Sequence, residues 1–275
     1  MLEHAAVANA NYAKLFEGHL PPPAHFPACF AFSVHKAGSS LMHNMIADAC
    51  RRECIPAISI PNILFREGIT DTEWGADKSL FSLIRDGILY FGFRHLPSFL
   101  IDGSGLVRSR PAVLLVRDPR DALVSHYYSL GRGKHSSHHL PRNNSQAFVD
   151  RLEQTADASI DDYVVRAALN HRNKLQAYRD NLDFSLVRVF RYEDVYFNKK
   201  SFIKGIFDHF EIRVSPQTLA TVATAHDIRP LVEDPTKHIR IGAPGDHVNK
   251  LRPQTIVYLN EFFAATCADF GYQLR

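Results

Sequence analysis

The chain has 275 residues and a formal net charge of +3, and these values already exclude several classes of protein. Hydrophobic residues make up 45% and charged residues 22% of the sequence, which is typical of a globular protein and not of a disordered or fibrous one. The charge is too small to indicate nucleic-acid binding, and no apolar run approaches the roughly 18 residues of a membrane helix. We therefore expect one α/β domain that covers residues 1–275.

The N-terminus and the cysteines indicate a cellular compartment. The first 16 residues lack the basic start and the apolar stretch of a secretion signal. The four cysteines form no C-x-x-C pair, although Cys50 and Cys54 are one helical turn apart. Reduced thiols in a cytoplasmic protein explain this pattern best.

Short apolar segments alternate with helical patterns along the chain. A helix ending near Gly18 is followed by three prolines, and residues 1–27 lead into the first strand. Strands are predicted at residues 28–34, 57–60, 88–93, 111–116 and 184–190. Helices are predicted at residues 77–85, 120–130, 145–155, 160–181, 199–210 and 254–270. The order predicts a three-layer α/β/α fold around a mostly parallel sheet of about five strands, with ligands at the carboxyl ends of the strands.

The segment after the first strand has the features of a phosphate-binding turn. Gly38 allows the backbone to turn and approach an anion, while Ser39 and Ser40 place hydroxyl and N–H groups at a helix N-terminus. Lys36 adds a positive charge. Because this lysine precedes the glycine, the order differs from a Walker loop and disfavours an ordinary ATPase. A plain glycine turn with a surface lysine explains the segment equally well by itself.

The fourth predicted strand leads into a second candidate anion site. Arg117 ends the strand, and Ser125 follows on the next helix, so a guanidinium and a hydroxyl can face one anion. Two alternatives stay open here. Arg117, Asp118, Arg120 and Asp121 can simply cap the helix and pair on its surface. Asp118 after an apolar strand also imitates the Walker B motif of a kinase, although an arginine intervenes.

Five separated segments between residues 29 and 252 together resemble the cytosolic-type sulfotransferases, and the substitutions suggest a divergent, bacterial-style member. These enzymes use 3′-phosphoadenosine 5′-phosphosulfate (PAPS) as sulfuryl donor. The matching segments are the turn at residues 35–41, Arg117 with Ser125, Arg-His-Leu-Pro at 94–97, Arg-Tyr-Glu-Asp at 191–194, and the glycine-containing segment 240–246. The resemblance implies a fold similar to the P-loop nucleotide hydrolases.

The resemblance also implies roles for individual residues. His95 stands at the position of the catalytic base, and a histidine with a pKa near neutrality suits that task. Lys36 stands where a lysine stabilises the leaving phosphate. The donor-binding positions are Lys36, Ala37, Gly38, Ser39, Ser40, Leu41, Arg117, Ser125, Tyr192, Arg240, Ile241 and Gly242. A hydrogen-bonded structural imidazole beside Pro97 is the alternative for His95.

The resemblance further implies a reaction and its partners. PAPS is expected as donor co-substrate and adenosine 3′,5′-bisphosphate (PAP) as product, with no metal. The acceptor is a hydroxyl or amine of a small molecule or glycan, and the protein is a monomer or a homodimer. An ATP-dependent small-molecule kinase and a non-catalytic nucleotide-binding module are the alternatives.

Several positions depart from the family pattern. Leu41 and His247 replace tryptophans, and Phe93 and Ile241 replace lysines, so those family roles do not transfer to these positions. Two other segments have open interpretations. Residues 135–144 form either a polar loop or a lid over the acceptor, and residues 67–77 either a solvated loop anchored by Trp74 or a site for a cationic acceptor.

Overall fold

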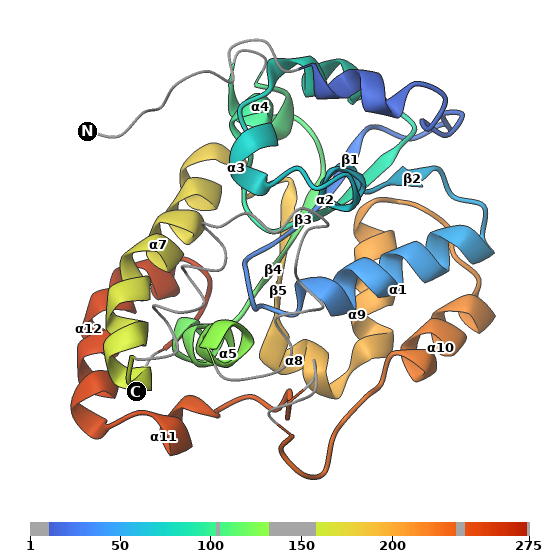
Figure 1. Ribbon diagram of the computed structural model, residues 1–275. Coiled ribbons are helices and arrows are strands. Elements are labelled where there is room, and N and C mark those ends of the chain that lie inside the picture. Colours follow the sequence, from blue (N-terminus) through green and yellow to red (C-terminus); the bar gives the residue numbers. More distant parts are fainter. Residues whose placement is uncertain (1–10, 103–104, 132–157, 235–239, 274–275) are drawn as a thin grey trace.

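A parallel sheet of five strands forms the centre of the computed structural model, which describes residues 11–102, 105–131, 158–234 and 240–273. The strand order is β2-β3-β1-β4-β5 (Figure 1). The strands are β1 (Cys29–Ser33), β2 (Ala57–Ile58), β3 (Leu89–Phe93), β4 (Ala112–Val116) and β5 (Val187–Arg191). This confirms the predicted fold class. The second strand is shorter than predicted, because Ile60 already begins a helix. The fifth strand begins at Val187, three residues later than predicted, and ends one residue later, at Arg191.

The central strands are apolar because both of their faces are covered. Every residue of β1 and of β4 is buried, as expected for a parallel sheet between two helical layers. In the register, Phe30 of β1 lies beside Tyr90 of β3 and Ala112 of β4. The residues of the edge strand β5 are half-buried or exposed. The turn at residues 34–38 thus leaves a strand that is buried on both faces.

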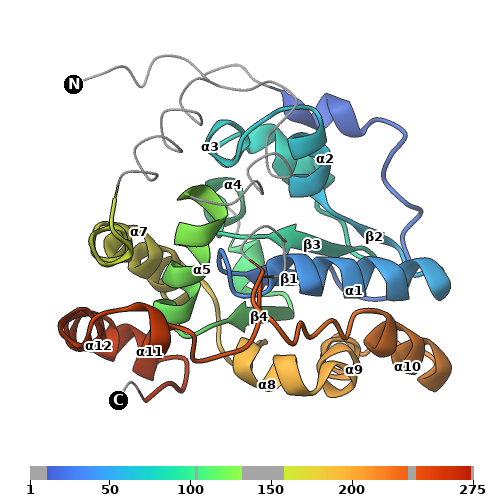
Figure 2. The ribbon, with the colours of Figure 1, turned by 60° about the horizontal axis from the view of Figure 1, so that its bottom comes forward.

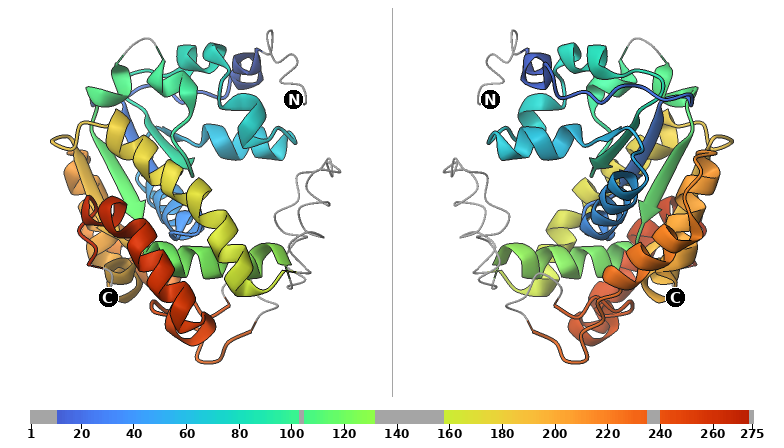
Figure 3. Two further views of the ribbon diagram at one scale, coloured as in Figure 1. Left: turned by 90° about the vertical axis from the view of Figure 1, so that its left-hand side faces the viewer. Right: turned by 90° about the vertical axis from the view of Figure 1, so that its right-hand side faces the viewer.

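Helices pack on both faces of the sheet. Figure 3 shows α7 in front of the strands in one view and α1 in front of them in the opposite view. The layer with α1 (Ser39–Arg52) also contains α9 (Lys199–His209) and α10 (Pro216–Ala225). On the other side, α7 (Ile160–Asn181) packs against α5 (Pro119–Gly131) and α12 (Pro253–Ala268). These three helices share a second apolar cluster that includes Leu123, Val164 and Phe263.

The remaining described elements are short. They are α2 (Ile60–Arg66), α3 (Asp71–Trp74), α4 (Ser98–Ile101), α8 (Tyr192–Phe197), α11 (His247–Lys250), and the 3-10 helices Tyr12–Phe16, Lys78–Leu83 and Leu106–Arg108. The predicted helices ending near Gly18 and at 77–85 are therefore 3-10 turns where they are described. The helix predicted at 145–155 lies outside the described residues.

Two further observations concern the environment of the protein. None of the described helices combines the length and apolar character needed to cross a membrane. All four cysteines are free thiols, and of these only Cys54 is exposed. A cytoplasmic location stays a prediction.

Candidate functional site

The carboxyl ends of four neighbouring strands carry the predicted site residues. In the sheet, β3, β1, β4 and β5 lie side by side, and neighbouring strands are about 4.8 Å apart. His95 follows β3, Lys36 follows β1, Arg117 directly follows β4, and Tyr192 directly follows β5. Figure 2 shows the start of α1 beside β1. The fold thus brings together four segments that are far apart in the sequence.

The turn between β1 and α1 has a backbone that its sequence makes possible. Lys36 has a φ of 65° and Gly38 a φ of 90°, so two of three consecutive residues are in the left-handed region. A Cβ atom on Gly38 would lie 2.7 Å from Cδ2 of Tyr192. Glycine is therefore required both for the backbone angle and for the close approach of the Tyr192 ring. Left-handed backbone at a non-glycine residue is a feature often found at ligand sites.

The N-terminus of α1 points its backbone donors toward this turn. The helix has 14 residues, and within the described chain no side chain caps its first turn at Gly38. Ser39 and Ser40 form that first turn and are half-buried, whereas Ala37 is fully buried. Unpaired N–H groups at the start of a long helix attract anions. Leu41 packs its half-buried side chain against the core, so an aliphatic surface stands at the position of the family tryptophan.

Arg117 is a buried cation with an unpaired donor. Only 8% of the residue is exposed. Its Nη1 donates to the backbone carbonyl of Lys36 at 3.4 Å, and its Nη2 lies 3.7 Å from Oδ2 of Asp121. Its Nε is buried and has no hydrogen-bond partner within the described part of the chain. Because buried donors are nearly always satisfied, this guanidinium fits an additional acceptor such as a phosphate oxygen.

Lys36 is the second cation of the site, and unlike Arg117 it has no counter-charge among the described residues. Burial, together with the smaller effects of the positive charges of Arg94 and Arg117, lowers the pKa of its ammonium to about 8. Across the described ranges, no carboxylate forms a salt bridge with Lys36. A desolvated ammonium that also feels the positive charge of two guanidinium groups is stabilised when an anion binds. The site therefore favours an anionic ligand at Lys36.

The segment at residues 240–247 is tied to the strand ends through Asp121 and Tyr192. Asp121, which is 1% exposed, accepts hydrogen bonds from the backbone N–H groups of Gly245 at 2.6 Å and His247 at 2.9 Å. Its Oδ1 also lies 2.7 Å from Nδ1 of His247. The Tyr192 hydroxyl donates to the carbonyl of Gly242 at 2.7 Å. These bonds place the predicted donor-binding loop over α5 and α8.

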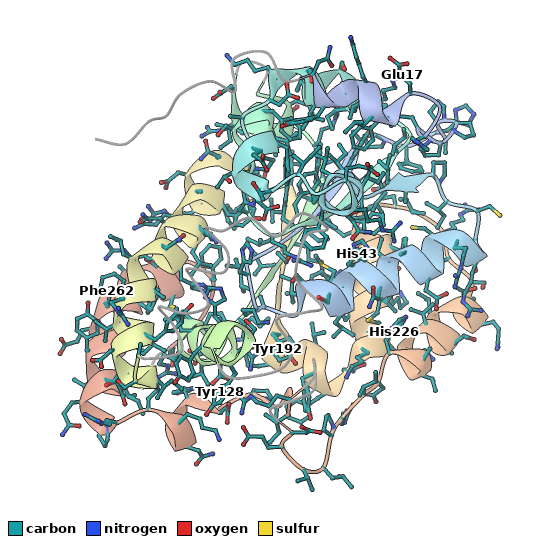
Figure 4. All side chains as sticks on the ribbon, viewed as in Figure 1. Glu17, His43, Tyr128, Tyr192, His226 and Phe262 are labelled. Atoms are coloured by element: carbon teal, nitrogen blue, oxygen red, sulfur yellow. The ribbon has the colours of Figure 1, made fainter. Side chains whose placement is uncertain are left out.

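Arg240 has its charge engaged within this segment. Its guanidinium forms ion pairs with Glu233 and Asp246, and its Cζ lies 4.2 Å from the ring centroid of Tyr128. Figure 4 labels Tyr128 and Tyr192, which hold the segment from α5 and α8. A phosphate at Arg240 would have to compete with two carboxylates. The predicted donor-binding roles of Arg240, and of the half-buried Ile241 beside it, stay predictions.

Ser125 is half-buried on α5, about two turns beyond Arg117. The intervening charged residues form the pairs that the sequence suggested, since Nη2 of Arg120 lies 2.6 Å from Oδ2 of Asp118. However, Arg117, Asp118 and Arg120 are at most 8% exposed, so these pairs are buried and do not lie on the surface. Arg120 also donates to Oδ1 of Asn260 at 2.6 Å. Asp118, the Walker B candidate, is therefore already neutralised by a protein cation.

His95, which follows β3, lies against α3, a helix that the sequence pattern did not predict. Its Nδ1 is 3.7 Å from Oδ2 of Asp71, and its ring centroid is 5.4 Å from that of Trp74. Trp74 is 1% exposed, which confirms its anchoring role, but residues 71–74 are a helix and not a loop. Burial lowers the pKa of the His95 imidazole, Asp71 raises it, and Lys174 lowers it again.

A further cation enters the site from α7. Nζ of Lys174 lies 3.1 Å from Nδ1 of His35, a residue that is 139 positions away in the sequence. Burial holds the pKa of His35 well below its usual range, and the charges of Lys174 and Arg94 act in the same direction. His35 is therefore neutral and accepts from the lysine. No local sequence pattern marked Lys174, because α7 reads as an ordinary amphipathic helix.

The described residues contain no group of three histidine, cysteine, aspartate or glutamate side chains placed to hold a metal ion. Arg117, Lys36 and the start of α1 instead offer positively charged and N–H donors, which suit phosphate and sulfate oxygens.

Solved structures provide a comparison for this arrangement. A mouse sulfotransferase in complex with PAP superimposes with a TM-score of 0.53, at 16% sequence identity and with 91% of each chain covered. The chain has the fold of the sulfotransferases. This confirms, at the level of the fold, the resemblance inferred from the sequence.

Two other solved structures match with lower scores. Retinol dehydratase in complex with androsterone and PAP has a TM-score of 0.48, at 14% identity over 96% of this chain and 87% of that one. A sulfotransferase from Alicyclobacillus acidocaldarius has a TM-score of 0.45, at 12% identity over 90% and 95%. No protein-family model and no curated protein matches the sequence.

Proposed function

We propose that the chain is a PAPS-dependent sulfotransferase that moves a sulfuryl group to a hydroxyl or amine of a small molecule or glycan. The observation that carries this proposal is that two cationic side chains, Lys36 after β1 and Arg117 after β4, lie next to each other. Arg117 donates to the carbonyl of Lys36 and keeps its Nε unpaired within the described chain, while Lys36 has no described carboxylate partner. A donor with a 5′-phosphosulfate and a 3′-phosphate requires two neighbouring cationic centres of this kind.

The residues present fit such a donor. Lys36, Ala37, Gly38, Ser39, Ser40 and Leu41 would hold the 5′ end at the start of α1, where N–H groups and an ammonium converge. Arg117 and Ser125 would hold the 3′-phosphate. Tyr192, Arg240, Ile241 and Gly242 would close the site, which is supported by the bond from Tyr192 to Gly242. When bound, PAPS supplies the sulfuryl group, and PAP is the product.

The chemistry assigned to this chain's own residues is proton removal and charge stabilisation. His95, through Nε2, would take the proton from the acceptor oxygen or nitrogen as the new bond to sulfur forms. Lys36 would stabilise the negative charge that develops on the phosphate oxygen as its bond to sulfur breaks. The electron pair of that bond leaves with the bisphosphate, and the proton stays on His95.

We also infer that residues 1–275 form one sulfotransferase domain. The proposed donor-binding residues extend from Lys36 to Gly242, and contacts between Asp121 and residues 245–247 link the two halves of the chain. The monomer or homodimer state and the cytoplasmic location are part of the same proposal. A kinase is less well supported, because the Asp118 carboxylate is paired with Arg120.

Transfer from PAPS labelled in its sulfuryl group to a panel of phenols, alcohols, amines and sugars tests the proposal. We expect mass spectrometry to detect an added sulfuryl group on at least one acceptor, and Lys36→Ala to abolish this transfer. If no acceptor gains a sulfuryl group while ATP transfers phosphate to a member of the same panel, the chain is a kinase and the proposal is wrong.

A further inference from the structure

We propose that Asp71 is a positioning residue for the catalytic base: it faces Nδ1 of His95, holds the ring with Nε2 free to accept a proton, and stabilises the imidazolium that forms. The Nδ1 to Oδ2 distance is 3.7 Å. Asp71 comes from α3, a segment outside all five of the sequence motifs that indicated a sulfotransferase. This inference rests on the proposed function, because it gives a role to a residue that acts through His95.

The local structure holds Asp71 in place. It is the first residue of α3, and the helix begins with a capping box in which Thr70 and Glu73 exchange hydrogen bonds. The Thr70 N–H donates to Oε2 of Glu73 at 2.6 Å. Asp71 is thus anchored through the backbone of a capped turn, and its carboxylate is 43% exposed and free to face His95. A capping box satisfies the first N–H groups of a helix, so this short segment has a defined geometry.

The imidazole is held on its other sides by apolar and small residues. The Trp74 ring lies at a centroid distance of 5.4 Å and an interplanar angle of 37°. A Cβ atom added to Gly75 would lie 3.5 Å from Nε2 of His95 and 2.8 Å from the carbonyl of Asp71. The tight contact of such a Cβ would be with the Asp71 carbonyl, so glycine at this position keeps the end of α3 close to the imidazole without a clash. The ring therefore has its Nδ1 toward a carboxylate and its Nε2 near Gly75, a residue without a side chain.

The charges around His95 explain why such a partner is needed. Burial is the largest effect and disfavours the imidazolium, Asp71 of α3 favours it, and Lys174 of α7 disfavours it to a smaller extent. The charges of His95 and Arg94 also act on His35. Asp71 raises the pKa of Arg94, as it raises that of His95. Burial, and then the charge of Asp71, raise the pKa of Tyr178 of α7, whose hydroxyl donates to the carbonyl of Ser33. Among these groups Asp71 is the counter-charge for an imidazolium, and without it a base in this cationic site is weak.

The consequence for the reaction is specific. With Nδ1–H directed at Asp71, the Nε2 lone pair is the site that accepts the proton of the acceptor hydroxyl or amine. The positive charge on His95 then lies beside a carboxylate during transfer. Removing that carboxylate leaves His95 in place but lowers its proton affinity, which weakens it as a base.

Trp74 provides a direct readout of His95 protonation that does not depend on activity. It is the only tryptophan of the chain, and it lies against the imidazole. A protonated imidazole quenches indole fluorescence, so a titration from about pH 4 to about pH 9 follows His95. We expect a titration in the wild-type chain, no such titration in His95→Gln, and a midpoint at lower pH in Asp71→Asn. Asp71→Glu is expected to restore the wild-type midpoint in part.

Asp102→Asn is the matched control, because Asp102 is an exposed carboxylate at the end of α4, in the segment that follows His95. It is expected to leave the midpoint unchanged. An Asp71→Asn midpoint equal to that of the wild-type chain would overturn the proposal, and so would the absence of a His95-dependent titration. A merely structural role of Asp71 would change the thermal midpoint without moving this titration.

Turnover with labelled PAPS gives the second readout. In Asp71→Asn we expect kcat to fall about tenfold with KM for PAPS unchanged, and the acidic limb of the kcat profile to move to lower pH. Calorimetry with PAP distinguishes a failure of the sulfotransferase proposal from a failure of the Asp71–His95 pairing. If PAP does not bind but the fluorescence midpoint still moves, the sulfotransferase proposal fails while the pairing of Asp71 with His95 stands. If PAP binds and neither profile moves, only the pairing is wrong.

Discussion

The guanidinium of Arg117 lies over the ring of Tyr192, with Cζ 4.5 Å from the ring centroid. The two residues directly follow the neighbouring strands β4 and β5, and the same ring packs against the turn at Gly38. Through Nη1, Arg117 also reaches the carbonyl of Lys36. One stacked pair therefore connects the turn after β1, the end of β4 and the start of α8.

Arg117→Ala is expected to weaken PAP binding by at least about 2 kcal/mol, or about thirtyfold in Kd, because charged hydrogen bonds to a phosphate are lost. Isothermal calorimetry measures this change. Arg191→Ala is the matched control, since Arg191 ends the adjacent strand but pairs with the exposed Asp194. Equal affinities of wild type and Arg117→Ala for PAP would remove Arg117 from the donor site.

Gly38→Ala tests the close approach of the phosphate-binding turn to Tyr192. The added Cβ would lie 2.7 Å from Cδ2 of Tyr192 at a φ of 90°, so we expect the free energy of unfolding to fall by about 1 to 3 kcal/mol and PAP binding to weaken. Gly18→Ala is the control, because Gly18 has a φ of 77° but no atom within 4 Å of the added Cβ. Urea unfolding that gives the same loss for both variants would show that only backbone strain matters.

Proton uptake on binding tests the environment of Lys36. Burial, together with Arg94 and Arg117, lowers the pKa of this ammonium to about 8, so about half of the molecules carry a neutral Lys36 near pH 8. A bound anion favours the charged form and raises the pKa, so PAP binding is expected to take up protons at about pH 8. Calorimetry in buffers of different ionisation enthalpy measures this uptake.

Two results check the assignment to Lys36. The uptake is expected to vanish near pH 6, where the lysine is already protonated in the free protein. It is also expected to vanish in Lys36→Arg, because a guanidinium stays charged at both values. Uptake that persists in Lys36→Arg would assign the proton to another group.

Asp121→Asn tests the anchoring of residues 245–247. Burial alone raises the pKa of this carboxyl, but the His247 side chain, Arg117 and the backbone N–H groups of His247 and Gly245 outweigh burial and lower it to about 2. We expect the variant to lose about 2 kcal/mol of unfolding free energy at neutral pH. Since the folded pKa is below the ordinary 3.8, this difference is present above about pH 4 and disappears as the pH falls through about 2.

Urea unfolding as a function of pH measures the Asp121 effect. Asp180→Asn is a suitable control, because the carboxylate of Asp180 is 56% exposed. A difference between wild type and Asp121→Asn that is the same at pH values of about 2 and 7 would contradict an ionised Asp121 as the anchor.

His95→Ala is expected to lower kcat by about 10² to 10⁴-fold and to leave PAP affinity unchanged, because a general base acts in the transition state and not in donor binding. Turnover with labelled PAPS and calorimetry measure the two quantities. His226→Ala is the control, since His226 lies near Asp48, away from the strand ends. Normal turnover of His95→Ala would assign the base to another group, such as Glu67 or the acceptor itself.

The residues at strand ends could be predicted from the sequence. Lys36, His95, Arg117 and Tyr192 each follow a short apolar segment, and parallel strands place such residues at one edge. The order of the motifs therefore indicated both the fold and the position of Lys36 and Arg117 at one edge of the sheet. The boundaries of α5, α7 and α9 also agree closely with the helical patterns, because these helices present long apolar faces to the core.

The residues that act across the fold could not be predicted. Asp71 belongs to a four-residue helix with too little length for a periodic pattern. Lys174 meets a histidine that is 139 positions away, and Asp121 meets a segment 126 positions away. Such contacts depend on how helices pack around the sheet, and a single sequence does not contain that distance information. Asp121 was visible only as one charge in a group assigned to the helix surface.

Calorimetric titration of the chain with PAP in EDTA, compared with AMP in EDTA and with ATP in the presence of Mg²⁺, tests the central claim most directly. The 3′-phosphate distinguishes PAP from AMP, and Arg117 is the cation assigned to it. The account predicts that PAP binds at least about tenfold more tightly than AMP without magnesium, and that Arg117→Ala removes this preference. Tight binding of ATP only with Mg²⁺, with PAP no better than AMP, would contradict it.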